Sequence, residues 1–413
     1  MYHDTDMRKV RKPTFVDLFS GCGGLSLGFI NAGYQGLLAV DHDPYAVSVY
    51  NDNLKGKYDA GAVVADLSTL SSKNAVLNFL KSHHVSPGDV DVLVGGPPCQ
   101  SYSVVGRNKI RALMESGGDL ERYWNDKNRE RTSLFNVFAL FLEVLEPKWF
   151  LFENVPAIQS HQSFKNLLGR FNSLDSVSGD ALLYEIYAAN YWASDFGVPQ
   201  KRRRFVMVGF KSGSIASGWR PPERVDQVTV EQAIGDLPEV AHGHKIRRIP
   251  YSPYRLTRYQ EMMRRGVTAE DEYAVTDHIC RWHNPDDVEL FSRMKPGARF
   301  ADVEVQQAIR EINPDHKLIK YSSDKFKDKL HKLDPEKPSW TVTAHLQKDG
   351  YKFIHYSQPR TISVREAARL QSFPDWFTFE SVSMVRAFGL IGNAVPPLMA
   401  EAFARSFIIN DNE

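Results

Sequence analysis

Short runs of hydrophobic residues recur between residues 14 and 154, and each run ends at a polar or glycine-rich turn. The runs are TFVDLF, GLLAVD, GAVVAD, DVLVGG and KWFLFEN. Segments with helical spacing lie between them, over residues 25–32, 44–53, 74–80 and 134–145. Continuous apolar runs of this length are typical of parallel strands buried on both faces, with the intervening segments as crossover helices. The pattern predicts an α/β fold with a doubly wound, Rossmann-like sheet, whose site lies at the carboxyl ends of the strands.

The pattern changes twice further along the chain. Two more strands are predicted over residues 183–189 and 204–210, and beyond residue 211 the chain becomes rich in proline, arginine and tyrosine. Regular patterning returns from residue 338, with the strand-like segment SWTVTAH and with helices predicted over residues 364–373 and 394–408. We therefore expect three segments: a large α/β unit over 1–210, a smaller irregular domain over 211–337, and a return over 338–413 that completes the large unit.

The composition is that of an ordinary globular protein. With 413 residues, 42% of them hydrophobic and 24% charged, the chain can bury a sizeable core, and neither disorder nor a membrane protein is indicated. The polar first 13 residues contain neither a signal-peptide core nor a membrane span. We expect a cytoplasmic protein that does not bind a membrane.

The charge is unevenly distributed, although the formal net charge is only +1. Residues 201–265 hold 14 Lys and Arg against six Asp and Glu, an excess of eight, so the rest of the chain is correspondingly acidic. This excess suits a phosphate backbone, although a solvated surface would show it about as often.

A glycine turn follows the first predicted strand, in FVDLFSGCGGLSLGF. Gly21, Gly23 and Gly24 let backbone amides at a helix start approach an electron-rich ligand closely. Asp41 closes the next strand 20 residues after Gly21, a spacing at which a carboxylate accepts hydrogen bonds from a ribose. Asp66 closes the third strand and is placed to reach an adenine amino group. A nucleoside-bearing cofactor fits this set, and the alternative is that both acids merely cap strand ends.

A second constellation lies at the ends of the next strands. Cys99 follows the strand DVLV in GGPPCQ, where prolines and glycines hold the turn rigid. Glu153 ends the strand KWFLFEN, and the basic run QKRRR, residues 200–204, begins another strand. Because neighbouring strand ends share one sheet edge, the thiol, the carboxyl and the guanidinium groups are expected to converge. A lone cysteine is more often an inert core residue, but this set indicates nucleophilic catalysis.

The other cysteines need separate explanations, because no CxxC pair indicates a disulfide or a thiolate zinc site. Cys22, within the glycine turn, is expected to fill space. His278, Cys280 and His283 lie close together in DHICRWH and raise the alternative of a metal site. Two imidazoles and one thiol without a clear fourth ligand are more often structural, so no metal is expected.

Together these segments resemble the DNA (cytosine-5)-methyltransferase family. The motifs FVDLFSGCGG, GGPPCQSYSVVGR, FENV, QKRRRF and IGNAVPP carry the resemblance, in that order, from about residue 14 to residue 400. The combination of PPCQ with ENV is highly specific. The resemblance implies transfer of a methyl group from S-adenosylmethionine to C5 of a flipped-out cytosine in a specific duplex sequence, with residues 211–337 as the target recognition domain.

The resemblance also implies roles for individual residues. Catalysis would use Cys99, Glu153, Arg202 and Arg204. The residues expected around S-adenosylmethionine are Phe19, Gly21, Gly23, Gly24, Leu25, Asp41, His42, Asp66, Leu67, Pro98, Leu134, Asn393 and Val395. DNA contacts are expected from Gln100, Ser103 and Arg107. His42 departs from the family pattern, since an aromatic residue often packs on adenine at this position.

The chemistry explains why these residue types are needed. C5 of cytosine is a weak nucleophile, so a thiolate must first add at C6, which is the role expected of Cys99. A protonated Glu153 would bond N3, Arg204 would hold O2, and Arg202 would hold the adjacent phosphate or Glu153 itself. The base must also leave the duplex, and the polar stretch 101–131 is predicted to close over it as a lid.

Two other functions are compatible with the sequence. One is the same chemistry on tRNA, which the long segment after QKRRR disfavours, because the tRNA-methylating branch of the family usually has a shorter one. The other is a silent DNA-binding protein, which the intact Cys99, Glu153 and Arg204 disfavour. Double-stranded DNA is the expected partner, a cognate restriction endonuclease is a candidate partner, and the protein is expected to be a monomer.

Overall fold

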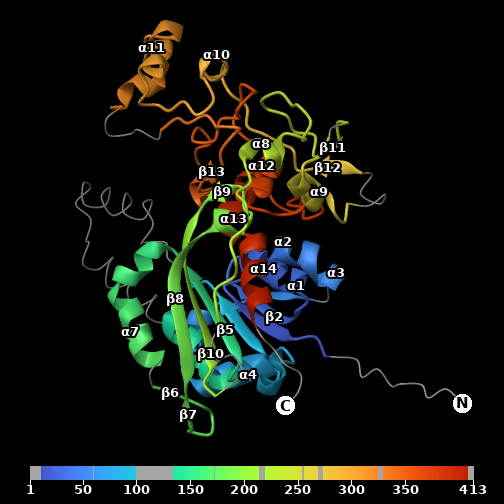
Figure 1. The fold of residues 1–413 in the computed structure, drawn as a ribbon, viewed down its shortest axis with the longest axis vertical. Helices are drawn as coiled ribbons and strands as arrows, with labels where there is room; N and C mark the ends of the chain where they lie inside the picture. The colour runs from blue at the N-terminus through green and yellow to red at the C-terminus, as the bar shows by residue number, and fades with distance from the viewer. Residues whose placement is uncertain are drawn as a thin grey trace, which may run out of the picture.

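The computed structural model describes residues 11–58, 60–98, 134–171, 173–213, 219–253, 255–267, 273–323 and 329–407. Within them a seven-stranded sheet has the order β3-β2-β1-β4-β5-β10-β8 (Figure 1). Its strands are β1 (Thr14–Leu18), β2 (Gln35–Asp41), β3 (Ala62–Val64), β4 (Val92–Gly95), β5 (Trp149–Asn154), β8 (Tyr184–Trp192) and β10 (Arg203–Lys211). The first five are parallel, whereas β10 runs antiparallel to both of its neighbours. The predicted α/β class with a wound central sheet is confirmed.

Helices cover both faces of the sheet. Alternate residues of each strand point in opposite directions, so every strand contributes side chains to both helix layers. In β5, Trp149 and Leu151 join the cluster under α1 (Gly24–Asn31) and α14 (Pro397–Ser406). Phe150 and Phe152 join the opposite cluster. That second face is covered by α4 (Lys73–Ser82), the helix Leu134–Leu145 and α7 (Gln162–Phe171). Both faces of the sheet are therefore buried, as the continuous apolar runs in the sequence predicted.

The helix predicted over residues 44–53 is the first part of a longer helical segment with three elements. Asp43 caps α2 (Pro44–Tyr50) by accepting a 3.0 Å hydrogen bond from the amide of Tyr45. A π-helical turn, η1 (Asn51–Lys55), follows directly, and α3 (Gly56–Tyr58) completes the segment. The wider π turn changes the direction of the side chains at its residues, and it is common at functional sites.

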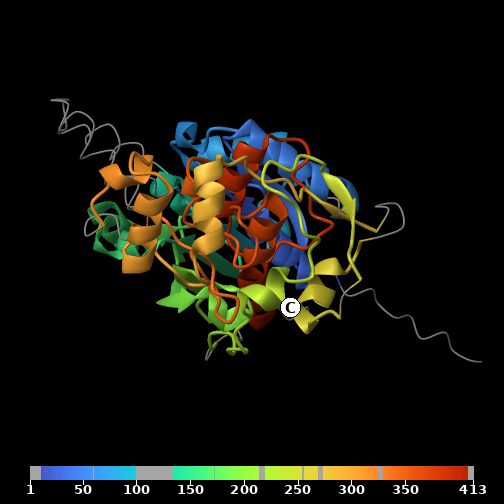
Figure 2. The same ribbon diagram turned by 90° about the horizontal axis from the view of Figure 1, so that it is seen from above.

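The irregular segment forms a second layer above the sheet (Figures 1 and 2). Its elements are α8 (Val230–Ile234), β11 (Arg248–Pro250), α9 (Arg258–Arg264), β12 (Ala274–Thr276), α10 (Pro285–Arg293) and α11 (Val303–Ile312). From above, the orange α10 and α11 lie on one side of the red C-terminal segment and the yellow segments lie on the other (Figure 2). Short strands β6 (Leu174–Asp175) and β7 (Ala181–Leu182) pair separately at the base.

The C-terminal segment contacts both layers. Its β13 (Ser339–Trp340) pairs in parallel with β9 (Gln200–Lys201), and α12 (Val364–Leu370) packs beside α8. The helix α13 (Met384–Asn393), which the sequence did not predict, leads into α14, which corresponds to the predicted closing helix. A single hydrophobic cluster combines Val49, Val230 and Phe373 with residues from all three parts of the chain. The domain boundaries at residues 210 and 337 stay a prediction.

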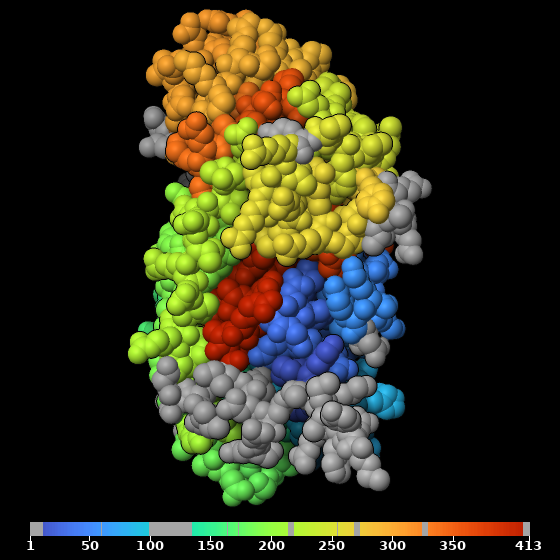
Figure 3. Space-filling model, turned by 45° about the vertical axis from the view of Figure 1, so that its right-hand side comes forward, coloured from blue at the N-terminus to red at the C-terminus, as the bar shows by residue number. Residues whose placement is uncertain are grey.

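Helix α14 lies directly against the N-terminal helix α1. A Cβ atom on Gly28 would approach the Cβ of Ala400 to 2.4 Å, so glycine is required where the two helices meet. Figure 3 shows the red C-terminal segment beside the blue N-terminal one. By length and composition the stretch Met384–Ser406 could cross a membrane, but 72% of its apolar window is buried inside the fold. Its apolar residues are therefore accounted for by the core.

Candidate active site

The glycine turn adopts the backbone that its sequence predicts. Gly21 and Gly23 have φ angles of +55° and +94°, a region that disfavours other residues. A Cβ atom on Gly23 would lie 2.8 Å from the ring of Tyr50, and one on Gly24 would lie 2.3 Å from the carbonyl oxygen of Val395. Gly23 is therefore packed against Tyr50 of α2, and Gly24 is packed against the C-terminal return, with no room for a larger residue at either position.

Two acids follow this turn at the edge of the sheet. The Asp41 carboxylate accepts hydrogen bonds of 2.8 and 2.9 Å from the amides of Gly21 and Asp43, which fix its orientation. The Asp66 carboxylate accepts a bond from Ser68, and that bond lowers the pKa of Asp66. His42 lies 3.3 Å from Asp41, whose hydrogen bond raises the pKa of the imidazole. Two carboxylates and an exposed imidazole thus face one edge, as the cofactor prediction requires.

Apolar side chains border these polar groups. Leu25 and Leu67 are buried, whereas Phe19 and Leu134 are half-buried and pack at the margin of the core. Phe19 has a φ of +62°, which is uncommon for a residue with a side chain and is held by the turn around it. Asn393, at the end of α13, is exposed, and Val395 covers Gly24. The predicted cofactor residues therefore gather around β1 to β3, with the return above them.

Arg202 differs from its predicted role. Its side chain is fully buried, and its guanidinium donates hydrogen bonds of 2.6, 3.1 and 3.0 Å to the carbonyls of Val342, Gly392 and Ala394. The guanidinium is therefore directed into the core, toward backbone carbonyls of the return. Its bonds attach the strand that carries Arg204 to the return that covers the glycine turn. The charge of the guanidinium also lowers the pKa of Glu153.

Glu153 and Arg204 form the centre of the second constellation. Nε of Arg204 lies 3.0 Å from Oε1 of Glu153, and both side chains are nearly buried. They meet because β10 runs antiparallel to β5, which brings the start of β10 to the carboxyl end of β5, with Phe205 opposite Asn154. Burial raises the pKa of Glu153, and the charges of the two arginines oppose that rise. The net effect favours a protonated carboxyl at a higher pH than usual.

The loop that leads to Cys99 begins beside this pair. A Cβ atom on Gly96 would lie 3.1 Å from Oε2 of Glu153, and the side-chain amide of Asn154 donates a 2.9 Å hydrogen bond to the carbonyl of Pro97. These contacts attach the loop to the end of β5, next to the predicted Pro98. Cys99, Gln100, Ser103, Arg107 and the predicted lid over 101–131 lie outside the described residues. Their predicted roles stay predictions.

Asp17 is a buried acid that the sequence analysis did not single out. It lies in the centre of β1, accepts a 2.6 Å hydrogen bond from Ser26, and burial raises its pKa to about 7. Its other oxygen has no hydrogen-bond partner among the described residues. The signal was present as the one charged residue in the apolar run TFVDLF.

The three metal-ligand candidates point to separate partners. His278 bonds Ser363 and the carbonyl of Pro238, each at 2.8 Å, and His283 bonds Thr361. Cys280 donates to the carbonyl of Ala241. Burial lowers the pKa of both histidines to about 4, so they are neutral side chains of the core. Within the described ranges no cluster of three potential ligands occurs.

A cleft of about 880 Å³ opens between the two layers. The ribbon of β9 and β13 forms its floor, and β9 leads into β10, the strand that carries Arg204. The turn Lys295–Arg299, before α11, forms its far wall. Backbone hydrogen bonds from Gly297 and to Ala298, at 3.1 and 2.9 Å, hold this turn against Lys332. Six basic side chains line the cleft: Lys201, Arg293, Lys295, Arg299, Lys337 and Lys352.

Only some of these cations are neutralised. Arg293 pairs with Glu289 and Glu311, and Lys337 pairs with Asp334. Across the part of the chain that the structure describes, no ion pair engages the four other basic side chains, Lys201, Lys295, Arg299 and Lys352. The cleft, which Lys201 lines three residues before Arg204, therefore offers positive charge to a ligand. The sequence analysis assigned the basic excess to residues 201–265, which include Lys201, but it missed Lys295, Arg299 and Lys352.

Comparison with known proteins identifies relatives over almost the whole chain. The model of the C-5 cytosine-specific DNA methylase family matches residues 13–408. Type II methyltransferase M1.HphI of Haemophilus parahaemolyticus is 32% identical, covering 97% of this chain and 88% of its own. Type II methyltransferase M.DdeI of Desulfomicrobium norvegicum is 31% identical, covering 94% and 87%.

Solved structures agree with these sequence matches. A prophage-encoded protein from E. coli, described as a DNA modification methyltransferase, shares 25% identity with a TM-score of 0.68. The match covers 96% of this chain and 98% of that one. The Entamoeba histolytica methyltransferase EhMeth, at 14% identity and a TM-score of 0.52, shares the fold.

Proposed function

Since the chain belongs to the C-5 cytosine-specific DNA methylase family, we propose that Cys99 is the nucleophile with which it methylates C5 of a flipped-out cytosine in a specific duplex sequence. The observation that carries this proposal is the buried Glu153–Arg204 pair, 3.0 Å apart, beside the start of the loop that contains Cys99. A carboxyl with a raised pKa and a guanidinium are the groups that an electron-rich pyrimidine ring requires.

The chemistry assigned to these side chains balances as follows. The Cys99 thiolate forms a bond to C6, and the electron pair of the C5–C6 bond moves into the ring. Glu153, protonated, donates to N3, while Arg204 donates to O2 and disperses the negative charge. After C5 has taken up the methyl group, a water molecule accepts the proton from C5. The electron pair of that C–H bond re-forms the C5–C6 double bond while the C6–S bond breaks, and its electron pair restores the Cys99 thiolate. Arg202 is assigned a positioning role through its three carbonyl contacts rather than a phosphate contact.

S-adenosylmethionine is the proposed cofactor, and it supplies the methyl group when bound. The residues at the glycine turn fit it: Asp41 suits the ribose hydroxyls, Asp66 suits the adenine amino group, and the exposed ring of His42 would stack on adenine. Phe19, Leu67 and Leu134 would exclude water from the adenosine. Asn393 and Val395 would close the pocket from the return.

The DNA is proposed to lie in the basic cleft, with residues 211–337 as the target recognition domain. Lys295, Arg299 and Lys352 would contact backbone phosphates, since their charges are not neutralised within the described structure. Gln100, Ser103 and Arg107 would contact the DNA next to the extruded base. The protein would act as a cytoplasmic monomer, with a cognate restriction endonuclease as a candidate partner, since relatives carry type II names.

Bisulfite sequencing of duplex DNA treated with the purified protein tests this proposal. Protected cytosines at one recurring sequence are expected, and only when S-adenosylmethionine is present. A parallel reaction with tRNA measures the competing substrate. Methylation of tRNA but not of duplex DNA would contradict the proposal, as would DNA methylation at a base other than cytosine.

A further inference from the structure

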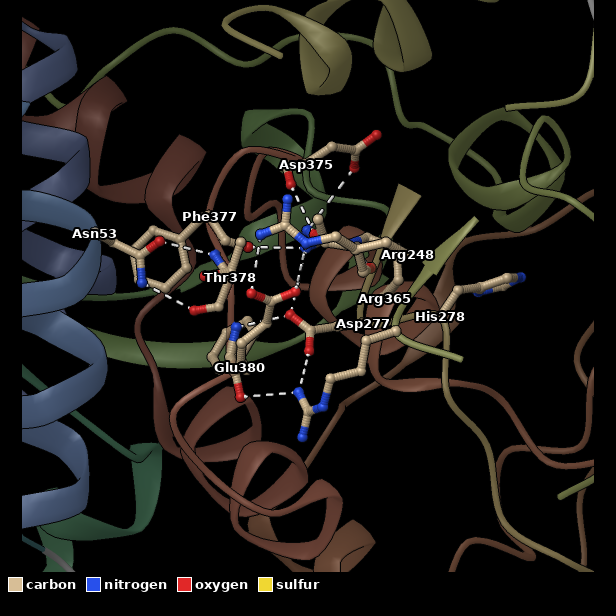
Figure 4. Close-up of polar contacts among 12 residues, drawn as sticks. Asn53, Arg248, Asp277, His278, Arg365, Asp375, Phe377, Thr378 and Glu380 are labelled. Carbon is tan, nitrogen blue, oxygen red and sulfur yellow. Dashed lines mark hydrogen bonds and ion pairs between the residues drawn. The ribbon is translucent and has the colours of Figure 1, made fainter. Parts of the chain in front are cut away.

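The segment Phe377–Phe379, here called the strap, connects α12 in the upper layer to the chain before α13. Its backbone is held by side chains from four other places in the sequence (Figure 4). Arg365 donates to the carbonyl of Phe377 at 2.9 Å, and Asp277 accepts from the amide of Phe379 at 2.7 Å. The strap is therefore fixed to the end of β12, in the proposed target recognition domain.

The opposite side of the strap is held by the cofactor half of the molecule. Asn53 donates a 2.8 Å hydrogen bond to the carbonyl of Thr378 and accepts a 2.7 Å bond from its amide. Asn53 is buried, and its Nδ2 also bonds the carbonyl of Val49 within its own helical segment. Both polar atoms of this amide are engaged, so Asn53 cannot turn without leaving backbone groups unpaired.

Further contacts join the same two bodies around this bond pair. Lys57 lies 3.7 Å above the ring of Trp376, one residue before the strap. On α13, Arg386 lies 4.6 Å from the ring centroid of Tyr45 and 3.8 Å from Asp43. The segment from Asp43 to Lys57 thus touches the chain on both sides of the strap.

The position of Asn53 gives these contacts a functional meaning. Asn53 lies in η1, and η1 continues α2, which begins two residues after His42. The strap, on its other side, leads through α13 to Asn393 and Val395, which cover the glycine turn. A cofactor bound between β2 and Val395 would therefore restrain both the segment that carries Asn53 and the segment that carries Thr378. Asp277 and Arg247, which lie 2.6 Å apart, carry that constraint into β12 and to the residue before β11.

We propose that Asn53 is a positioning residue that couples the cofactor site to the DNA-binding layer, so that each ligand tightens the binding of the other. This inference rests on the proposed function. Coupling between two ligands is reciprocal, and couplings in proteins usually change affinity between about 5- and 150-fold. Asn53 links the two halves directly, because its side chain hydrogen-bonds both the carbonyl and the amide of Thr378.

Asn51 offers a matched control, because it makes the same pair of bonds two residues away. Its side chain donates to the carbonyl of Ala62 at 3.0 Å and accepts from the amide of Ala62 at 2.8 Å. Ala62 belongs to β3, so this contact stays within the cofactor half. Loss of the Asn51 bonds should lower the free energy of unfolding by a similar amount, but it leaves the contact between Asn53 and Thr378 in place.

The test is the affinity for duplex DNA, measured with and without S-adenosylhomocysteine. The duplex carries the site mapped by bisulfite sequencing. For the wild-type protein and Asn51→Ala, the nucleoside is expected to lower the Kd for DNA by about fivefold or more. For Asn53→Ala the ratio of the two Kd values is expected to fall below about twofold. A lower Tm alone would leave this ratio unchanged.

Should Asn53→Ala fail to fold, Asn53→Asp serves instead, because it keeps the acceptor for the Thr378 amide and loses the donor to its carbonyl. An undiminished ratio in the Asn53 variant, or no coupling in a wild-type protein that methylates DNA, would overturn the inference alone. A wild-type protein that neither binds nor methylates DNA would overturn the proposed function as well.

Discussion

At the scale of single residues, burial raises the pKa of two acids that lie near the carboxyl ends of β1 and β5. Glu153 is held beside Arg204, and burial raises its pKa despite the opposing charge of the guanidinium. Asp17 lies beneath the glycine turn with a pKa raised to about 7. Raised pKa values predict activity and stability that decrease as pH rises through them.

Replacing Glu153 tests the first acid. The proton on the wild-type carboxyl is lost as pH rises through its raised pKa, so the methylation rate should fall on the alkaline side. Glu153→Gln, which cannot ionise, should transfer methyl groups about 100-fold more slowly or worse, with that alkaline limb removed. The measurement is the single-turnover rate between pH 6 and 9. An alkaline limb that stays at the same pH in the variant would exclude Glu153 as its origin.

Replacing Asp17 tests the second acid through stability. Because the folded protein favours the protonated carboxyl, stability is fullest below the unfolded pKa and is lost as pH rises through about 7. A shift from 3.8 to about 7 sets an upper bound of ~4 kcal/mol on this loss. Asp17→Asn should show a smaller decrease in unfolding free energy between pH 5 and 8. Equal pH dependence in urea unfolding of both proteins would contradict this role.

At the scale of elements, close approaches between distant segments build the cofactor edge. Gly24 meets Val395, Gly28 meets Ala400, and Arg202 binds the carbonyls of the return. These contacts hold a C-terminal segment against the turn after β1, where the cofactor is proposed to bind.

Gly24→Ala should disrupt this edge. The added Cβ would lie 2.3 Å from a backbone carbonyl, so the return must move, at a cost of about 1–3 kcal/mol. Affinity for S-adenosylmethionine, measured by calorimetry, should fall with the lost stability. Gly56→Ala is the control, since nothing lies within 4 Å of its added Cβ and its φ is ordinary. Unchanged cofactor affinity in Gly24→Ala would argue against the proposed pocket.

The sequence predicted elements better than contacts. The apolar strands and the spacing of Gly21, Asp41 and Asp66 follow local rules, and the structure forms that edge as expected. Arg202 was misassigned because a run of arginines does not reveal which side chain is buried. Asn53 was not detected, because its partner Thr378 lies 325 residues away and no local pattern links them. The helix α13 was not predicted, although its last three residues belong to the motif IGNAVPP.

At the scale of the whole molecule, a basic cleft lies above the β9–β13 ribbon, which joins the two layers. Formal net charge does not reveal this surface, because the acidic remainder of the chain cancels it. The ribbon of β9 and β13 ties the layers together on one side, and Asn53 with the strap ties them on the other.

The triple variant Lys295→Gln, Arg299→Gln and Lys352→Gln tests the cleft. If each cation contacts a phosphate, the slope of log affinity against log salt should decrease by about three, and affinity at low salt should fall. The sequence that is methylated should not change. Lys81→Gln, on the exposed end of α4, is the control. An unchanged slope, or a changed methylation sequence, would contradict phosphate contacts at these residues.

The central claim is that Cys99 is the nucleophile in methyl transfer to cytosine. It is tested most directly by replacing Cys99, with a replacement of Cys280 as the control. Transfer of a labelled methyl group from S-adenosylmethionine to duplex DNA is measured for the wild-type protein, Cys99→Ser and Cys280→Ser. The account predicts transfer by the wild type and by Cys280→Ser, whose thiol is bonded to Ala241 in the upper layer, and none by Cys99→Ser. Methyl transfer by a folded Cys99→Ser protein at the wild-type rate would contradict it.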